Sequence, residues 1–89
     1  MSWDYRLGAE AIRDLRDLGP SATKEIVGWL DERIHGAANP CAFGKPLRGD
    51  RKGYWRYRVR DWRLICRIED QVLVVIVVAV GHRSNLYED

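Results

Sequence analysis

The sequence has few of the features that mark secreted, metal-binding or membrane proteins. Its only two cysteines, Cys41 and Cys66, show no CxxC or Cys/His ligand spacing, so we expect neither a disulfide framework nor a zinc site. The longest apolar run, Val72 to Val80, is about half as long as a membrane-spanning helix. No apolar run after the first residues resembles a signal peptide. We therefore expect a cytoplasmic protein without a membrane segment, a metal or a cofactor.

Length and composition indicate one folded domain. The chain has 89 residues, which is enough for one domain and too few for two. Hydrophobic residues make up 46% of it, which favours a packed globule over a disordered chain. We expect a single domain over residues 1–89.

Positive charge is concentrated in one part of the sequence. Residues 45–67 contain nine Lys or Arg but only Asp50 and Asp61, a net charge of +7. The remaining residues contain six Lys or Arg and eleven Asp or Glu, a net charge of −5. Such segregation indicates one electropositive surface, as in proteins that bind nucleic acids or acidic proteins.

The first half of the chain predicts a strand and a helical hairpin. Apolar residues alternate with charged ones over residues 3–7, which is typical of a strand. A helical period then runs over residues 9–18 and ends at Gly19-Pro20. Ser21 is the expected cap of a second helix, with Gly36 beyond its end. Residues 36–46 show no sustained period and predict one long connection.

The second half predicts three strands. Strict alternation on both sides of a turn at Arg60-Asp61 predicts a hairpin with one apolar and one cationic face. The expected cationic side of its first strand holds Tyr54, Arg56, Arg58 and Arg60. After a turn at Glu69-Asp70, the continuous β-branched run of residues 72–80 predicts a central strand buried on both sides.

Together these elements predict an α+β fold with the order β-α-α-β-β-β. We expect a mainly antiparallel four-stranded sheet, with the helical hairpin on its apolar face. The pattern leaves the place of the first strand open. On the uncovered face, Arg56, Arg58 and Arg63 should lie close together.

Neighbouring arginines on a sheet favour an anion as ligand. Like charges placed opposite each other destabilise a sheet, and a polyanion relieves that repulsion. The guanidinium group also binds phosphate through two charge-assisted hydrogen bonds. The alternative is a solvated, solubilising face, which acidic residues would normally intersperse. Tyr54 lies among these arginines and suits base stacking and partial burial equally well.

Several short elements, taken in order, resemble the RelE/ParE superfamily of bacterial toxins from toxin–antitoxin modules. The resemblance covers almost the whole chain. Its elements are Leu47-Arg48-Gly49, Trp55-Arg56-Tyr57-Arg58-Val59, Asp61-Trp62-Arg63-Leu64-Ile65, Val80-Gly81-His82-Arg83 and Leu86-Tyr87.

The resemblance implies a site and partners. RelE-like toxins are endoribonucleases that cut messenger RNA in the ribosomal A site, and this branch implies Arg63, Arg83 and Tyr87 as catalytic residues. It implies RNA binding by Arg48, Arg51, Lys52, Tyr54, Arg56 and Arg58. An acidic antitoxin is expected to wrap the basic face in an oligomeric complex, with the ribosome and mRNA as further partners. The alternatives are a ParE-like inhibitor of DNA gyrase, which is not a nuclease, and a nucleic-acid-binding module without toxicity.

The implied chemistry needs no metal, because RNA can be cut by its own 2′-hydroxyl group. Arg63 and Arg83 would stabilise the charge on the phosphate, and Tyr87, with its pKa lowered by nearby arginines, would carry a proton. Well-known members have lysines where this chain has Arg56 and Arg58, and arginine is a poor proton donor. His82 is a weaker candidate base, because neighbours on a strand face opposite ways. His35 is weaker still.

Overall fold

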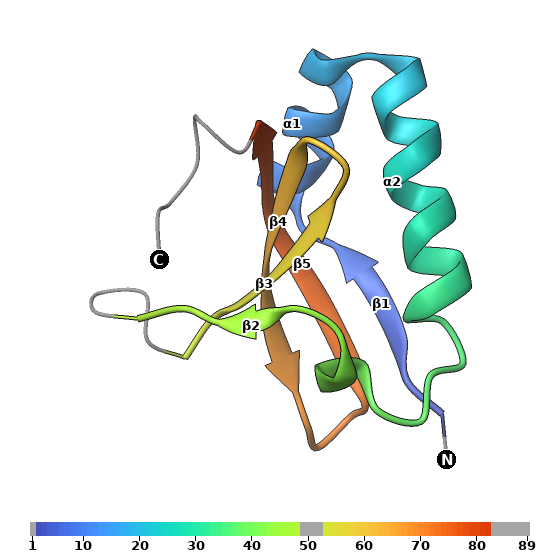
Figure 1. Cartoon of the computed structure of the whole chain (residues 1–89), viewed down its shortest axis with the longest axis vertical. Coiled ribbons are helices and arrows are strands. Elements are labelled where there is room, and N and C mark those ends of the chain that lie inside the picture. Colours follow the sequence, from blue (N-terminus) through green and yellow to red (C-terminus); the bar gives the residue numbers. More distant parts are fainter. Residues whose placement is uncertain (1, 49–52, 83–89) are drawn as a thin grey trace.

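The computed structural model describes residues 2–48 and 53–82, which form a helical hairpin packed on a mixed five-stranded sheet (Figure 1). The sheet order is β1-β5-β4-β3-β2; β1 runs parallel to β5, and all other pairs are antiparallel. The expected α+β class and antiparallel C-terminal strands are confirmed. The elements are β1 (Asp4–Leu7), α1 (Ala9–Leu18), α2 (Pro20–Arg33), the 3-10 helix η1 (Pro40–Ala42), β2 (Lys45–Pro46), β3 (Trp55–Val59), β4 (Trp62–Glu69) and β5 (Val74–His82).

The expectation of four strands was wrong, because β2 adds a fifth. This strand has two residues, Lys45 opposite Arg56 and Pro46 opposite Trp55. Two residues are too few to show an alternating pattern, and proline is rare inside sheets because it has no N–H to donate. This restriction does not apply to an edge strand such as β2. Because neither alternation nor residue type marked residues 45–46 as a strand, β2 could not be predicted from the sequence.

The helical hairpin turns at a single glycine. Gly19, with φ 99°, ends α1 and also precedes the first residue of α2. Pro20 begins α2, where its missing N–H costs nothing. The expectation that Ser21 caps this helix was therefore wrong. The turn is held instead by the Thr23 hydroxyl, which lies 3.0 Å from the Leu15 carbonyl oxygen and 2.9 Å from that of Gly19.

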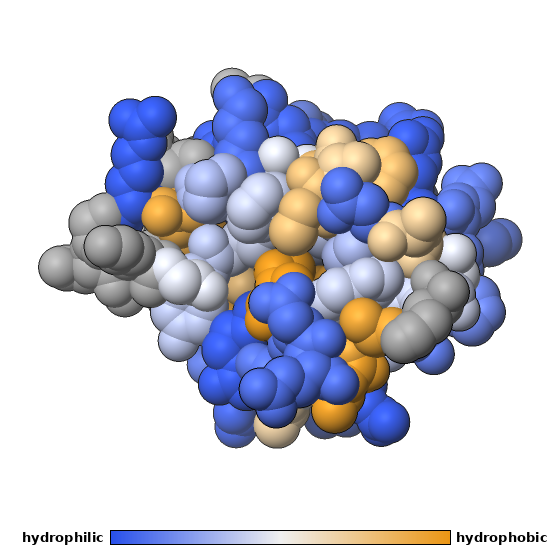
Figure 2. All heavy atoms as spheres, turned by 90° about the horizontal axis from the view of Figure 1, so that it is seen from below, coloured by the Kyte–Doolittle hydropathy of each residue, from blue (hydrophilic) through white to orange (hydrophobic). Residues whose placement is uncertain are grey.

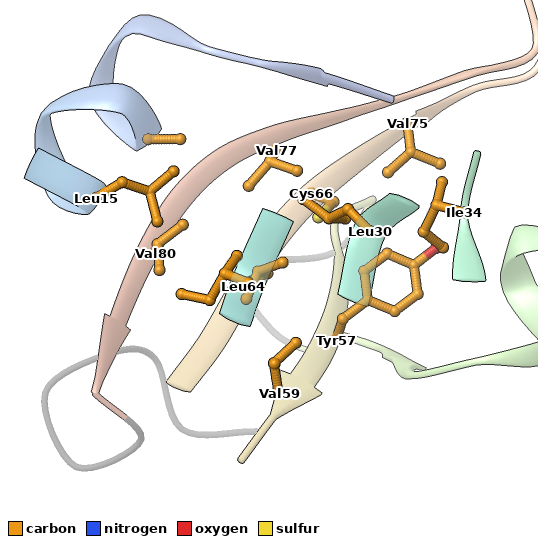
Figure 3. Close-up of a cluster of buried hydrophobic side chains, with 12 residues drawn as sticks. Leu15, Leu30, Ile34, Tyr57, Val59, Leu64, Cys66, Val75, Val77 and Val80 are labelled. Atoms are coloured by element: carbon orange, nitrogen blue, oxygen red, sulfur yellow. The ribbon is translucent and has the colours of Figure 1, made fainter. Parts of the chain in front are cut away.

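The main core lies between the helices and the sheet, as expected (Figure 3). Side chains from α1 and α2 meet the apolar sides of β3, β4 and β5 there. Burying such side chains stabilises the fold by about 1.5–3 kcal/mol each, before the loss of chain entropy is counted. The buried residues are Ala11, Leu15, Ile26, Leu30, Ile34, Tyr57, Val59, Leu64, Cys66, Val75, Val77 and Val80.

Strand β5 differs from the strand expected over residues 72–80. It begins at Val74, and Val72 is 67% exposed in the preceding turn. Burial in its first half is one-sided: Val75 and Val77 are buried, whereas their neighbours Val74 and Ile76 are only half-buried. The expectation of burial on both faces was wrong for this half of the strand, because the helices cover only one side of the sheet.

An irregularity in β5 changes which residues face the helices. Ile65 pairs with Ala79 and Cys66 pairs with Val77, so Val78 has no partner in the β4–β5 ladder. Beyond it, Ala79 faces the open side and Val80 returns to the core. The backbone N–H of Val80 donates to the Asp14 carboxylate on α1 at 2.9 Å. Asp14 thus binds β5 beyond the last residue that β1 pairs.

Two aromatic side chains fasten the connection before β2 to β3. The Tyr57 hydroxyl donates to the Pro40 carbonyl oxygen at 2.8 Å, and the indole N–H of Trp55 donates to the Phe43 carbonyl oxygen at 2.7 Å. At Gly44 the backbone has φ 75°, and a Cβ there would collide with the Arg56 carbonyl oxygen. The connection can therefore lie directly against β3 only with glycine at this position.

The exposed surface is mixed in character. Figure 2 views the end that carries the β4–β5 turn, and its hydrophobic residues form small separate patches among hydrophilic ones. Across residues 2–48 and 53–82, neither helix is long and apolar enough to cross a bilayer.

Candidate functional site

The face of the sheet away from the helices brings three arginines together. Arg58 on β3 pairs directly with Arg63 on β4, and Arg56 lies two residues before Arg58 on the same strand. Side chains directly opposite each other in an antiparallel pair have Cβ atoms about 4.5–5.5 Å apart. The predicted proximity of these residues is confirmed. We call Arg56, Arg58 and Arg63 the arginine cluster.

The arginine cluster is recessed into its surroundings. Arg56 and Arg63 are each only 8% exposed, whereas Arg58 is exposed. Ordering such long side chains in advance lowers the entropy that a ligand must remove on binding. The arginine cluster is therefore a partly preorganised cationic surface.

A small apolar cluster forms the floor beside these arginines. It consists of the buried residues Leu47, Ile65 and Ala79, with Tyr54 and Val78 packed against them. Tyr54 is thus partly buried by packing, the simpler of its two expected roles, and its stacking on RNA stays a prediction. The open face therefore combines cations with a limited apolar surface.

Arg60 does not belong to this face, although the alternation of β3 placed it there. The turn gives it φ 53°, and its Nε atom lies 2.8 Å from a Glu25 carboxylate oxygen on α2. Since strand alternation holds only while the chain stays extended, a residue in the turn escapes it. Arg60 instead forms an ion pair on the helix side.

The other predicted site residues fall into two groups. Arg48 is exposed and follows Leu47, whose N–H donates to the Tyr54 carbonyl oxygen at 3.0 Å. This backbone hydrogen bond holds Leu47 in place on the open face, and Arg48 is the next residue along the chain. The predictions for Arg51, Lys52, Arg83 and Tyr87 lie outside the described residues.

Neither histidine lies on the open face. His82 pairs with Trp62, whose side chain packs against the main core, so His82 points to the helix side near Asp14 and Asp17 of α1. His35 lies 3.1 Å from an Asp4 carboxylate oxygen. This hydrogen bond, with a second from a backbone N–H, lowers the pKa of Asp4. The geometry favours structural roles for both histidines.

Sequence reasoning missed one cation of this region. Lys45 on β2 pairs with Arg56, which extends the row of positive side chains to the sheet edge. Its only sequence signal was its place in the basic segment, because β2 was not expected.

No group of three or more His, Cys, Asp or Glu side chains that could hold a metal occurs within the part of the chain that the structure describes. Burial raises the pKa of the Cys66 thiol, so it favours the neutral form.

Comparison with known proteins gives consistent similarities. A family model described as "ParE toxin of type II toxin-antitoxin system, parDE" matches residues 5–87. The chain is 31% identical over 87 residues to Toxin RelG of Mycobacterium tuberculosis, covering 98% of both chains. It is 33% identical over 81 residues to Toxin RelE of the same organism, covering 89% of this chain and 79% of the relative.

Solved structures share the fold. The toxin–antitoxin complex RelBE2 from Mycobacterium tuberculosis contains a chain with a TM-score of 0.83 and 30% identity, covering 93% of this chain and 100% of that one. YafQ from E. coli has a TM-score of 0.63 and 19% identity, covering 98% of this chain and 100% of that one, which supports the fold alone.

Proposed function

The chain belongs to the RelE/ParE superfamily of type II toxin–antitoxin toxins, and we propose that it inhibits translation by cutting messenger RNA on the ribosome. The substrate is a single strand of mRNA, and the reaction uses no metal. The proposal extends to the site: the arginine cluster holds the RNA backbone, and Arg83 and Tyr87 act on the cleaved phosphate.

The observation that carries this proposal is the direct pairing of Arg58 with Arg63 on the open face. Two guanidinium groups that lie directly opposite each other on adjacent strands repel each other, and a phosphate bound between them attracts both. Arg56 supplies a further recessed cation in the same region. RNA offers one such phosphate per nucleotide, so it fits this surface better than a single small anion does.

The proposed reaction is transesterification within the RNA. The ribose 2′-oxygen attacks the adjacent phosphorus and forms the 2′-O–P bond, while the P–O5′ bond breaks. The 2′-hydroxyl proton goes to a base and the leaving 5′-oxygen receives one from an acid, so the products are a 2′,3′-cyclic phosphate and a 5′-hydroxyl. Arg63 stabilises the charge that develops on the nonbridging oxygens. Tyr87 is the proposed proton carrier.

The same basic face is the proposed binding site of a cognate antitoxin. A relative has been solved in a toxin–antitoxin complex, which supports a partner of this kind. An acidic antitoxin that covers the arginine cluster would neutralise it and exclude RNA at once. We propose that this complex contains several chains and lies in the cytoplasm.

The second candidate function is inhibition of DNA gyrase. The description of the matching family model, a ParE toxin, favours it. In that case the open face binds an acidic protein surface and no bond is broken. The arginine cluster alone serves both functions, because a carboxylate-rich protein and a nucleic acid attract the same cations.

Purified toxin, released from its antitoxin, distinguishes the two. Programmed ribosomes and the same free mRNA would be incubated with it, and cut sites mapped by primer extension. We expect cuts at defined codon positions on ribosomes and feeble cutting of free RNA, because the ribosome holds the strand in attack geometry. Intact message on ribosomes, together with inhibited gyrase supercoiling, would replace this proposal with the second.

A further inference from the structure

A pocket at the outer edge of β3 lies beside the arginine cluster. It has a volume of about 270 Å³ and is lined by Trp29, Gly44, Lys45, Arg56 and Arg58. β2 pairs only with the first two residues of β3, and no other strand among the described residues pairs with the outer edge of β3 beyond them (Figure 1). We call it the edge pocket. Lys45, Gly44 and Trp29 had no part in the site expected from the sequence.

The walls of the edge pocket are held in place by the core. The Trp29 ring lies 5.1 Å from the Tyr57 ring and 6.1 Å from the Phe43 ring, measured between centroids. The Tyr57 hydroxyl and the Trp55 indole fix the connection that leads to Gly44. The aromatic wall and the chain opposite are therefore preformed, which favours binding of a ligand without rearrangement.

The lining has the chemistry of a nucleotide site. Three of its five residues are cations and none is acidic, so it attracts an anion. The fourth, Trp29, supplies an aromatic surface, and stacking of a base on an aromatic side chain is worth about 1–3 kcal/mol. The volume of about 270 Å³ is just below the range of about 300–1,000 Å³ for small-molecule pockets, so the pocket has room for no more than one nucleotide.

Backbone groups of β3 add polar contacts there. The pairing of Lys45 with Arg56 and the Leu47 to Tyr54 hydrogen bond show that Arg56, and Tyr54 just before β3, turn their backbone polar groups toward the segment that contains β2. Backbone direction alternates along a strand, so Arg58 turns its own groups the same way, beyond the start of β2. These groups can bind the edge of a base.

Charge defines the direction of a bound strand. Arg58 lines the edge pocket and also pairs with Arg63, so the two regions are continuous. A second hollow of about 570 Å³, on the α2 side, shares Trp29 and Arg58 but has a mixed lining, with Glu25 and Glu32 beside Lys24 and Arg60. The edge pocket has no carboxylate in its lining. An RNA strand that leaves Arg63 through Arg58 is therefore favoured in the edge pocket over the second hollow.

We infer that the edge pocket binds the RNA nucleotide next to the cleaved phosphate, with its base against Trp29 and its phosphate on Lys45 and Arg58. This inference rests on the proposed nuclease function and adds a second contact to it. The site would fix the register of the strand, because a base stacked at the edge sets which phosphate reaches Arg63.

The test measures binding of the full-length chain to a 2′-O-methyl RNA tetranucleotide, which lacks the attacking hydroxyl, by NMR titration. We expect Lys45→Ala to weaken binding about threefold to tenfold, as for loss of a charge-assisted contact at an exposed site. Lys24→Ala is the matched control: it removes the same charge from the second hollow and should leave affinity unchanged. Trp29→Leu should weaken binding about fivefold or more, and Trp29→Phe less, because phenylalanine keeps a ring.

The outcomes separate this inference from the function on which it rests. If wild type binds and Arg63→Ala weakens binding, but Lys45→Ala and the folded Trp29 variants match wild type, the edge pocket is not a nucleotide site and the nuclease proposal stands. If wild type neither binds the tetranucleotide nor cuts message on ribosomes, both fail. If Lys45→Ala weakens only the complex with the antitoxin, the pocket serves a protein and the inference is overturned. Because Trp29 packs against the main core, Lys45→Ala decides the case if the Trp29 variants do not fold.

Discussion

The two faces of the sheet are built on opposite principles. The face under the helices holds a continuous cluster of twelve buried residues (Figure 3), whereas the buried apolar residues on the open face, within the part of the chain that the structure describes, are Leu47, Ile65 and Ala79. The folding free energy must therefore come mainly from the helix side, since hydrophobic stabilisation scales with the apolar area removed from water. The open face can then carry groups that do not help the fold.

The arginine cluster is such a group. Arg58 and Arg63 are placed where they repel each other, and a solvated face of mixed charge would be more stable without a ligand. Functional sites often retain this kind of unfavourable arrangement, because binding needs it. The comparison teaches that one face specifies the fold and the other specifies what it binds, and mutations on the two should separate stability from activity.

The largest effect is expected from truncating adjacent residues of β4 that face opposite ways. Leu64→Ala should reduce the free energy of unfolding by about 2–5 kcal/mol, because it leaves a cavity in the main core. Ile65→Ala should cost less, because only a small cluster packs on it and its surroundings can collapse. Urea denaturation of both variants measures the difference. Equal losses would mean that the open face contributes to the core as strongly as the helix side.

A second effect should appear in activity while the fold is kept. Arg63→Ala removes the proposed phosphate contact and should reduce message cutting on ribosomes by about 1.5–3 kcal/mol of transition-state stabilisation, or roughly 10- to 150-fold. Arg60→Ala is the control, since its side chain pairs with Glu25 on the helix side. The cleavage rate at saturating ribosomes measures both. An equal loss in the two variants would point to overall charge as the cause.

The sequence predicted most of the helix-side face, because repeating patterns report burial. The alternation of β3 and β4 correctly placed Tyr57 and Leu64 on the helix side of the sheet and Arg58 and Arg63 on the open face. The errors arose where the conformation or the pairing of a single residue interrupts the alternation of a strand. The turn carried Arg60 to the other side of the sheet, and the unpaired Val78 shifted the alternation of β5.

The edge of the site was beyond sequence reasoning for a different reason. Strand β2 and the edge pocket depend on contacts between distant segments, such as the 2.8 Å hydrogen bond from Tyr57 to Pro40. Local periodicity carries no information about such contacts. Gly44 was one of several glycines in the sequence, and only the structure shows that a side chain there would strike β3.

The third prediction tests how that edge is held against the helix-supported sheet. Gly44→Ala forces a side chain into a backbone with φ 75° and against β3, which should cost on the order of 1–3 kcal/mol. Gly36→Ala also has positive φ, at 81°, but meets nothing within 4 Å, so it isolates the backbone strain. Thermal unfolding of both measures the difference. If Gly36→Ala is as harmful as Gly44→Ala, close packing against β3 is not what requires the glycine.

The smallest effect should have opposite signs for stability and binding, and it is the sharpest test of the contrast between the faces. Arg58→Gln removes one member of the like-charged pair, so the free energy of unfolding should rise by about 0.2–1 kcal/mol. Binding to single-stranded RNA should weaken, and the slope of log affinity against log salt should fall by about 0.7, because one phosphate contact fewer releases counterions. Arg67→Gln is the control, because Arg67 lies on β4 with Glu69 3.6 Å from its Nε atom and is not part of the arginine cluster. A variant that loses stability while keeping the wild-type salt slope would show that Arg58 supports the fold, and the open face would then have no separate role in binding.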